Sequence, residues 1–484
     1  MFRTIMIKEF LDNLLNLRFM VGLLVSVILT VACVMLQANT YSRRMQDYHD
    51  DVRQQENTIN KYGPISWNFN ETPLIQPEAL SPVAIGLSAD DNSGFDANFL
   101  PNLFPFIDLV FVVSIIMSLL GILFSYDSIC GEREQGTLKL ICSNNISRAT
   151  ILLGKWVGGT ASLLIPFLIS ILMAAIYIAL DPGIMWLKSD WAGFWALIAG
   201  SVSYISMFYL LGLMVSALSR NSSVSVLKSI LLWILIVLVI PNLGPYVSSE
   251  LFPIPSLVRI TKEYNQLSGE EGAKRAKEVH ELIAELDKRY EEKYGELFKE
   301  YIAIPREKRL ERTGMESPDS DIKTMGLKYR QEYRAIGEKI DAPIMERREK
   351  VREQIKIEAE RQTRVSKNIA AISPFADYIY LSADLAGTGM RSKENIERAT
   401  SEFGALADKF SQEKSDEKDR KRISDWKNIK DNPLDISGRP RFSYEEEPLP
   451  ARISVSLPYL GVMLLYGVLF FAIAFVGFIR YDVR

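Results

Sequence analysis

Six long apolar segments constrain the fold of this 484-residue chain more than any other feature. A helix needs about 20 apolar residues, with a range of roughly 17 to 25, to cross the hydrocarbon core of a bilayer. The segments of that length and character are residues 19–36, 109–126, 156–180, 191–218, 229–247 and 455–479. The chain is therefore predicted to be an all-α membrane protein with six transmembrane helices.

Two long polar segments explain why charged residues still make up 24 % of the chain. Residues 37–106 are rich in Asn, Asp and Pro and are predicted to form an irregular or mixed lobe. In residues 248–454, apolar side chains recur every three or four positions among Glu, Lys and Arg, as in long amphipathic helices. This second segment is predicted to be a large, mainly helical domain built on a helical hairpin.

The basic residues of the short connections predict the orientation in the membrane. Lys139, Arg148 and Lys155 follow the second predicted span and Arg220 follows the fourth, whereas residues 181–190 hold one lysine and two aspartates. The positive-inside rule therefore places both termini in the cytoplasm. The two long polar segments are then predicted to be extracytoplasmic.

Residues 1–18 are predicted to form an amphipathic helix along the membrane surface, because Phe2, Ile5, Met6 and Phe10 fall near one helical face. A helix continuous with the first span is the alternative. A signal peptide is not favoured, since the apolar run that follows is longer than a usual signal core and lacks a small-residue cleavage site.

Several kinds of chemistry are not expected from this sequence. A phosphate-binding loop of the form GxxxxGK[ST] would need glycine at Ala149 and Ser or Thr at Trp156, although Gly154 and Lys155 fit the pattern. The chain is therefore not expected to be an enzyme or to hold a cofactor, and ATP and Mg²⁺ would have to be bound by a partner ATPase subunit.

Metal and nucleic-acid binding are also not expected. The two histidines, His49 and His280, lie far from the three cysteines and form no zinc-binding pattern. Three cysteines offer no disulfide framework. The net charge of −3 is spread over the segments, so no basic surface favours nucleic acid.

The connection after the second span, residues 127–155, carries the most specific motif. It resembles the loop between the second and third membrane helices of ABC-2 type transporter permeases. The matching residues are Gly131, Glu132, Glu134, Gly136, Thr137 and Leu138, then residues 144–148, then Gly154 and Lys155. Asn145 stands where that family usually has proline, so the turn is expected to be looser or differently shaped.

The resemblance implies that this loop contacts a cytoplasmic ABC ATPase subunit. Charged side chains followed by an apolar anchor would then transmit closure of the ATPase to the second and third spans. The residues expected to couple the two subunits are Gly131, Glu132, Arg133, Glu134, Gly136, Thr137 and Leu138. The alternative is a solvated loop in which the acidic residues only cap helices.

The small residues at the start of the third span permit two interpretations. Gly154, Gly158 and Gly159 could form a hinge during gating, or they could allow neighbouring helices to pack closely. Ionisable residues are predicted only at the borders of the spans, which argues against a proton-coupled carrier.

The resemblance implies a permease subunit in the bacterial or archaeal inner membrane, paired with an identical or related permease and exporting a substrate. The stretch 373–389 resembles part of the large extracytoplasmic insert of some ABC-2 permeases. An alternative hypothesis is a mechanotransmission or scaffold subunit, whose long helices relay ATPase-driven motion to an extracytoplasmic protein partner. The identity of the substrate stays open.

Overall fold

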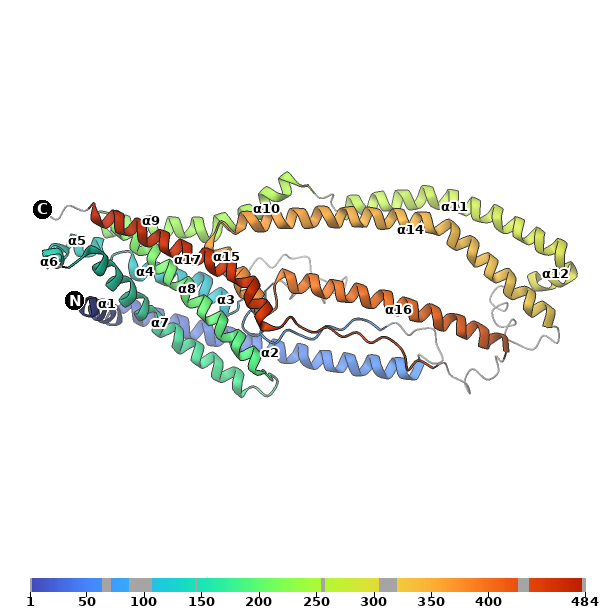
Figure 1. The fold of residues 1–484 in the computed structure, drawn as a ribbon, viewed down its shortest axis with the longest axis horizontal. Coiled ribbons are helices and arrows are strands. Elements are labelled where there is room, and N and C mark those ends of the chain that lie inside the picture. The colour runs from blue at the N-terminus through green and yellow to red at the C-terminus, as the bar shows by residue number, and fades with distance from the viewer. Residues whose placement is uncertain are drawn as a thin grey trace.

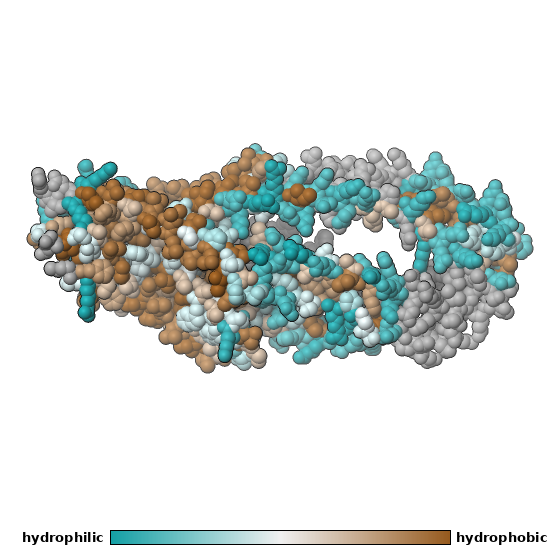
Figure 2. Space-filling view, viewed as in Figure 1, coloured by the Kyte–Doolittle hydropathy of each residue, from teal (hydrophilic) through white to brown (hydrophobic). Residues whose placement is uncertain are grey.

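A computed structural model of the chain describes the backbone of residues 2–62, 71–86, 107–143, 146–253, 257–303, 320–424 and 435–480. Within these ranges all regular structure is helical, and six helices are long and apolar enough to cross a membrane. The molecule is elongated, with a compact helical bundle at one end and long helices extending from it (Figure 1). Apolar residues gather on the bundle and polar residues on the extension (Figure 2). The predicted all-α membrane fold is confirmed.

The membrane-spanning helices differ in how regular they are. The second and fifth spans each contain a π-helical stretch, in which the backbone hydrogen bonds lengthen by one residue. In chain order, the spans are built from α2 (Leu17–Tyr62), α3 (Leu109–Phe111) with η1 (Val112–Met117) and α4 (Ser118–Ser125), α7 (Arg148–Leu180), α8 (Lys188–Leu218), α9 (Ser222–Ile234) with η2 (Leu235–Val239) and α10 (Ile240–Leu251), and α17 (Leu449–Ile479).

Four helices outside the spans form most of the extension, together with the outer half of α2. They are α11 (Leu257–Tyr294), α12 (Glu296–Ala303), α14 (Ser320–Ala370) and α16 (Met390–Ser424). The helices α11 and α14 lie side by side as a hairpin (Figure 1). A separate aromatic and apolar core at the tip holds the hairpin together, and its buried members are Leu286, Tyr290, Phe298, Tyr301, Met325 and Tyr329.

The helix α15 (Pro374–Ala386) connects the hairpin to the bundle. It begins four residues after α14 ends, with Ser373 as its N-cap, and packs against α8 and α17. The ring of Tyr378 stacks on Tyr204 of α8 with centroids 4.4 Å apart, and its hydroxyl lies 2.8 Å from the Ser201 hydroxyl. The hairpin of α11 and α14 is thus attached directly to the core of the spans.

The first helix, α1 (Phe2–Leu14), is separated from α2 by a turn at Leu15 and Asn16, so the two are not one continuous helix. It packs along α7, where a Cβ on Gly158 would lie 2.5 Å from the Met6 carbonyl oxygen. A Cβ on Gly159 would collide with Tyr209. These glycines therefore permit close helix packing, and the position of α1 along the membrane surface stays a prediction.

Candidate ATPase-coupling site

Two short helices form the predicted coupling segment at the end of the bundle where both chain termini lie (Figure 1). They are α5 (Cys130–Glu134) and α6 (Thr137–Ser143), which join the second span to the third. Between them Gly136 has φ of +73°, a left-handed conformation that glycine adopts without the steric penalty of a Cβ. The turn sets the direction of α6 relative to α5.

The end of α8 holds the start of α5 in place. The hydroxyl oxygen of Ser216 accepts hydrogen bonds from the backbone N–H groups of Ile129, at 3.0 Å, and Cys130, at 3.1 Å. These are donors that the first turn of a helix leaves unpaired. Three residues further on, the Arg133 guanidinium donates to the Ser219 carbonyl oxygen at 2.9 Å. The helix α5 is therefore anchored to the end of the fourth span.

Glu134 anchors α5 to the start of the fifth span. Its carboxylate accepts one hydrogen bond from the Ser222 backbone N–H, at 2.9 Å, and another from the Ser222 hydroxyl, at 2.7 Å. Ser222 is the first residue of α9, so the carboxylate sits where the helix dipole favours negative charge. Glu134 thus links α5 to α9 through a helix terminus.

Glu132 lies at the centre of a charge cluster formed by Lys8, Glu9, Glu132 and Lys155. Glu9 and Lys155 are buried, Glu132 is largely buried, and Lys8 is about half exposed. Its two carboxylate oxygens pair with Lys8 of α1, at 2.8 Å, and with Lys155 of α7, at 3.0 Å. Lys155 is only 1 % exposed and also pairs with Glu9 of α1. Two lysines and two glutamates neutralise one another, which compensates the cost of burying each charge. The cluster joins α5, α1 and α7 into one unit.

The helix α6 has an inward and an outward face. Leu138 is completely buried in the main core, and the Thr137 hydroxyl donates to the Glu132 carbonyl oxygen at 3.2 Å. On the other face Lys139 is exposed and Leu140 is 69 % exposed. The apolar contact available to another subunit at α6 is therefore Leu140, whereas Leu138 serves the chain's own core.

Most of the predicted coupling residues contact this chain rather than face outward. Glu132, Arg133 and Glu134 lie together on α5, and each binds a residue outside it. The sequence motif includes Lys155 but does not mark it as a coupling residue, and it does not point to Lys8, Glu9, Ser216, Ser222 or Leu140. Only Leu140 had a local signal, since a helix that buries residues 138, 141 and 142 turns residues 139, 140 and 143 outward. Asn145 lies outside the described residues.

Two further contacts tie the neighbouring spans together at this end. Arg18, near the start of α2, pairs with Asp127 at 2.8 Å and donates to the Tyr126 hydroxyl at 2.9 Å. Arg148, at the start of α7, donates to the carbonyl oxygens of Phe478 and Ile479 at 2.6 Å. A cation at the last carbonyls of a helix stabilises that end. The contacts thus connect the first, second, third and sixth spans.

The arrangement joins the helices at this end of the bundle and leaves one face of α6 exposed. Within the described part of the chain, no three His, Cys, Asp or Glu side chains are placed to hold a metal ion. The lysines at this end are paired with carboxylates, as Lys8 and Lys155 are, or exposed on α6, as Lys139 is. Such a unit can transmit a displacement between α6 and the spans, because its helices are joined by buried ion pairs and capping bonds.

The sequence profile of the ABC-2 family transporter proteins matches residues 3–483. The chain belongs to the ABC-2 transporter family. Membership in this family makes it the membrane subunit of an ABC transporter.

A curated relative matches a shorter stretch. The probable ABC transporter permease protein NosY of Stutzerimonas stutzeri is 42 % identical over 72 residues, which are 15 % of this chain and 26 % of that protein. The chain thus aligns with about a quarter of the length of this curated relative. The similarity supports the permease assignment and leaves the substrate open.

Proposed function

We propose that this chain is a permease that couples ATP hydrolysis by a separate ABC ATPase to export of a substrate across the cytoplasmic membrane. Its termini and the α5–α6 segment would face the cytoplasm, and a second permease, identical or related, would complete the transporter. ATP and Mg²⁺ would be bound by the ATPase subunits.

The observation that carries this proposal is the attachment of α5 to three parts of the bundle. Glu132 is paired with Lys8 and Lys155, and Glu134 is bonded to the first residue of α9. A force applied to α6 would therefore reach α1, α7 and α9 together. Leu140 and Lys139 on the exposed face of α6 supply an apolar and a basic group for the ATPase surface.

Association of the ATPase with tagged chain tests the proposal. The chain is purified from its native cells in mild detergent, and the co-purifying ATPase is identified by mass and assayed for ATP hydrolysis. Leu140→Asp places a charge in the proposed contact and should lower ATPase recovery at least tenfold. Leu406→Asp is the matched control, since Leu406 is 58 % exposed on α16 at the other end of the molecule. Equal ATPase recovery with both variants would contradict the proposed contact.

A relay of motion to an extracytoplasmic protein partner is the second candidate. It is favoured by the direct path from the hairpin through α14 and α15 to Tyr204 and Ser201 of α8. In that case no cargo need cross the spans, and the hairpin itself would deliver the output.

Shortening the hairpin separates the two candidates. Residues 276–340 are replaced by a short Gly-Ser linker. Arg275 and Asp341, which form an ion pair at 2.6 Å, then lie on either side of the linker. A permease that only exports should restore the cellular function of a strain lacking the gene. A relay should keep its permease-dependent ATPase activity and fail to restore that function.

A further inference from the structure

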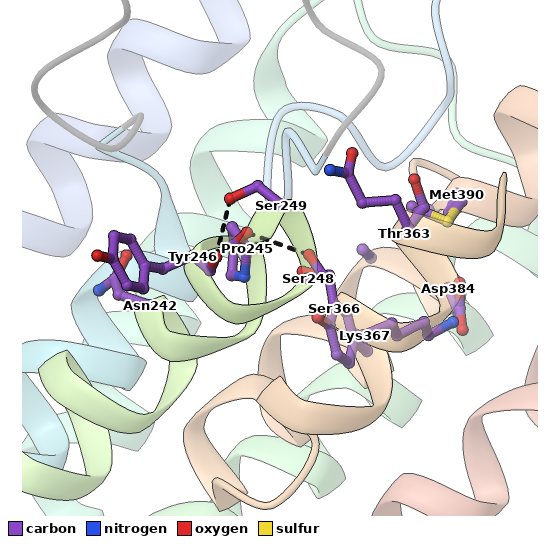
Figure 3. A pocket seen from close by; sticks show the side chains of 14 residues that line it. Asn242, Pro245, Tyr246, Ser248, Ser249, Thr363, Ser366, Lys367, Asp384 and Met390 are labelled. Atoms are coloured by element: carbon purple, nitrogen blue, oxygen red, sulfur yellow. Dashed lines mark hydrogen bonds between the residues drawn. The ribbon is translucent and has the colours of Figure 1, made fainter. Parts of the chain in front are cut away.

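A cavity of about 710 Å³ lies at the end of the span bundle opposite the coupling site. It is formed where α10, the continuation of the fifth span, meets α14, α15 and the start of α16 (Figure 3). Its volume is in the range of pockets that bind small organic molecules, about 300 to 1,000 Å³. Neither the coupling site nor the family assignment accounts for it.

Lys367 supplies a positive charge to this cavity. Its ammonium group lies over the rings of Tyr380 and Tyr459, 5.2 and 5.4 Å from their centroids. Among the described residues no carboxylate lies within 4.0 Å of the ammonium nitrogen. Two aromatic faces therefore hold the lysine side chain in position while its charge stays available to an anion.

Asp384 supplies a negative charge to the same cavity. Its Oδ2 atom is buried and has no hydrogen-bond partner among the described residues. Burial raises the pKa of this carboxyl, and Lys367 and Arg391 act in the opposite direction. The Lys367 side chain extends toward Asp384 (Figure 3), yet the two form no ion pair within 4.0 Å. Within the described residues, neither charge is therefore neutralised by an ion pair.

The cavity borders an apolar surface that runs along the fifth span. Leu235, Leu238, Val239 and Leu243 are 41 to 46 % exposed on η2 and α10. Hydroxyl and amide groups, including Ser249 and Thr363, line the cavity itself. A mainly apolar cavity that carries one positive and one negative side chain, beside a stripe of exposed apolar side chains, fits an amphipathic ligand that carries both charges at one end.

We propose that this cavity binds the headgroup of a phosphoethanolamine phospholipid from the surrounding bilayer. The phosphate would bind Lys367 and the ammonium group would bind Asp384, while the acyl chains lie along the exposed face of the fifth span. Charge-assisted bonds of this kind are stronger than neutral hydrogen bonds. The inference depends on the membrane-spanning bundle and is independent of ATPase coupling and of export.

Native mass spectrometry of the detergent-solubilised full chain with added lipids tests this site. The probes are phosphatidylethanolamine and phosphatidylglycerol with the same acyl chains, titrated separately. Lys367→Ala should weaken binding of both lipids about tenfold, because both carry phosphate. Asp384→Asn should weaken phosphatidylethanolamine about tenfold and leave phosphatidylglycerol unchanged. Lys356→Ala, at an exposed position on the same helix as Lys367, is the matched control.

A substitution that fills the cavity provides a second test, and it leaves both charged side chains in place. Ser249 lines the cavity at an exposed position on α10, so Ser249→Trp should block the headgroup while the protein still folds. Glu250→Trp adds the same ring at the neighbouring exposed residue, which does not line the cavity. Tenfold weaker lipid binding in Ser249→Trp alone would support the site. Equal binding by both tryptophan variants, or by Lys367→Ala and Lys356→Ala, would overturn it.

Discussion

The two ends of the span bundle bury carboxylates in opposite ways. At the coupling end Glu132 lies between Lys8 and Lys155, and its charge is balanced by ion pairs at 2.8 and 3.0 Å. At the other end Asp377 of α15 is 1 % exposed, and neither of its oxygens has a hydrogen-bond partner among the described residues. Buried charge joins helices at the first end and carries an uncompensated cost at the second.

Charge therefore stabilises the contacts between helices at the coupling end, whereas it destabilises the fold at the other end. The paired cluster connects α1, α5 and α7, so losing the buried Lys155 leaves Glu9 without its cation and Glu132 with only the exposed Lys8. Asp377 has no such partner, and burial raises the pKa of its carboxyl to about 7. Removing charge should therefore destabilise the coupling end and stabilise the other end.

The largest effect is expected from Lys155→Met. Glu9 loses the buried ion pair that Lys155 provides and Glu132 loses one of its two cations, so the free energy of unfolding should fall by about 3 to 5 kcal/mol. Chemical denaturation in detergent micelles measures this change. Lys139→Met, which removes an exposed lysine from α6, should change the stability by less than about 0.5 kcal/mol. Similar losses in the two variants would contradict a charge-linked coupling unit.

Asp377→Asn should act in the opposite direction and depend on pH. The carboxyl has a usual pKa near 3.8 and a raised pKa of about 7 in the folded protein. The folded state therefore holds the proton more tightly, and its stability falls as the pH rises from about 4 to 7. The variant should be more stable than the wild type at pH 8 by about 2 kcal/mol. This value is smaller than the full pKa shift would give, because solvent partly screens the charge.

Denaturation curves at pH 4 and pH 8 check the Asp377 prediction. At pH 4 the two proteins should differ little, because the folded carboxyl is protonated and the unfolded carboxyl, with its pKa near 3.8, is only about half ionised. A variant that is less stable than the wild type at pH 8 would show that the charge of Asp377 is compensated after all.

Substitutions at two glycines compare the coupling end with the hairpin of α11 and α14. Gly136→Ala should destabilise the protein by about 1 kcal/mol, because the residue has φ of +73°. Gly337→Ala, in the interior of α14 with open space at the Cβ position, should stabilise it by about 0.5 to 1 kcal/mol. Thermal unfolding of the two variants in the same detergent gives both signs. Changes of the same sign would count against the left-handed turn between α5 and α6.

The smallest effect is expected from Lys8→Ala. The Lys8 side chain is 47 % exposed, so its pair with Glu132 is largely screened and should contribute less than about 1 kcal/mol. Glu132 keeps its buried partner Lys155 in this variant. A double-mutant cycle with Glu132→Gln isolates the pairwise energy. A coupling as large as that between Lys155 and Glu132 would contradict the assignment of Lys155 as the main cation.

The sequence predicts the parts of the fold that depend on local pattern. Apolar length alone identifies the six spans, and the recurrence of apolar residues identifies the helices of the outer hairpin. The sequence leaves open whether α1 and α2 form one continuous helix, since no glycine or proline marks the break between them. The sequence predicts an irregular or mixed lobe from residue 37, but residues 37–62 are helical. The polar residues there continue a helix that begins in the membrane segment.

The sequence predicts the location of the candidate site better than its internal bonding. The motif directs attention to residues 131–138, but it does not reveal that Glu132 pairs with Lys8 and Lys155. Those residues are 124 positions before and 23 positions after Glu132 in the sequence. Contacts of this kind depend on how α1 packs along α7, which no local pattern specifies. The motif includes Lys155, but nothing in the sequence shows that its ammonium group pairs with Glu132.

The most direct test of the account is the ATPase activity of the assembled complex with Glu132→Gln. Glu132→Gln keeps the shape of the side chain and leaves the Glu134–Ser222 bonds and the exposed face of α6 intact. In liposomes, the amount of bound ATPase and its rate of ATP hydrolysis are measured in the same preparation. The account predicts normal binding of the ATPase, with loss of the change in hydrolysis rate that the wild-type permease causes. Unchanged regulation of hydrolysis by Glu132→Gln would contradict the claim that this cluster couples the two subunits.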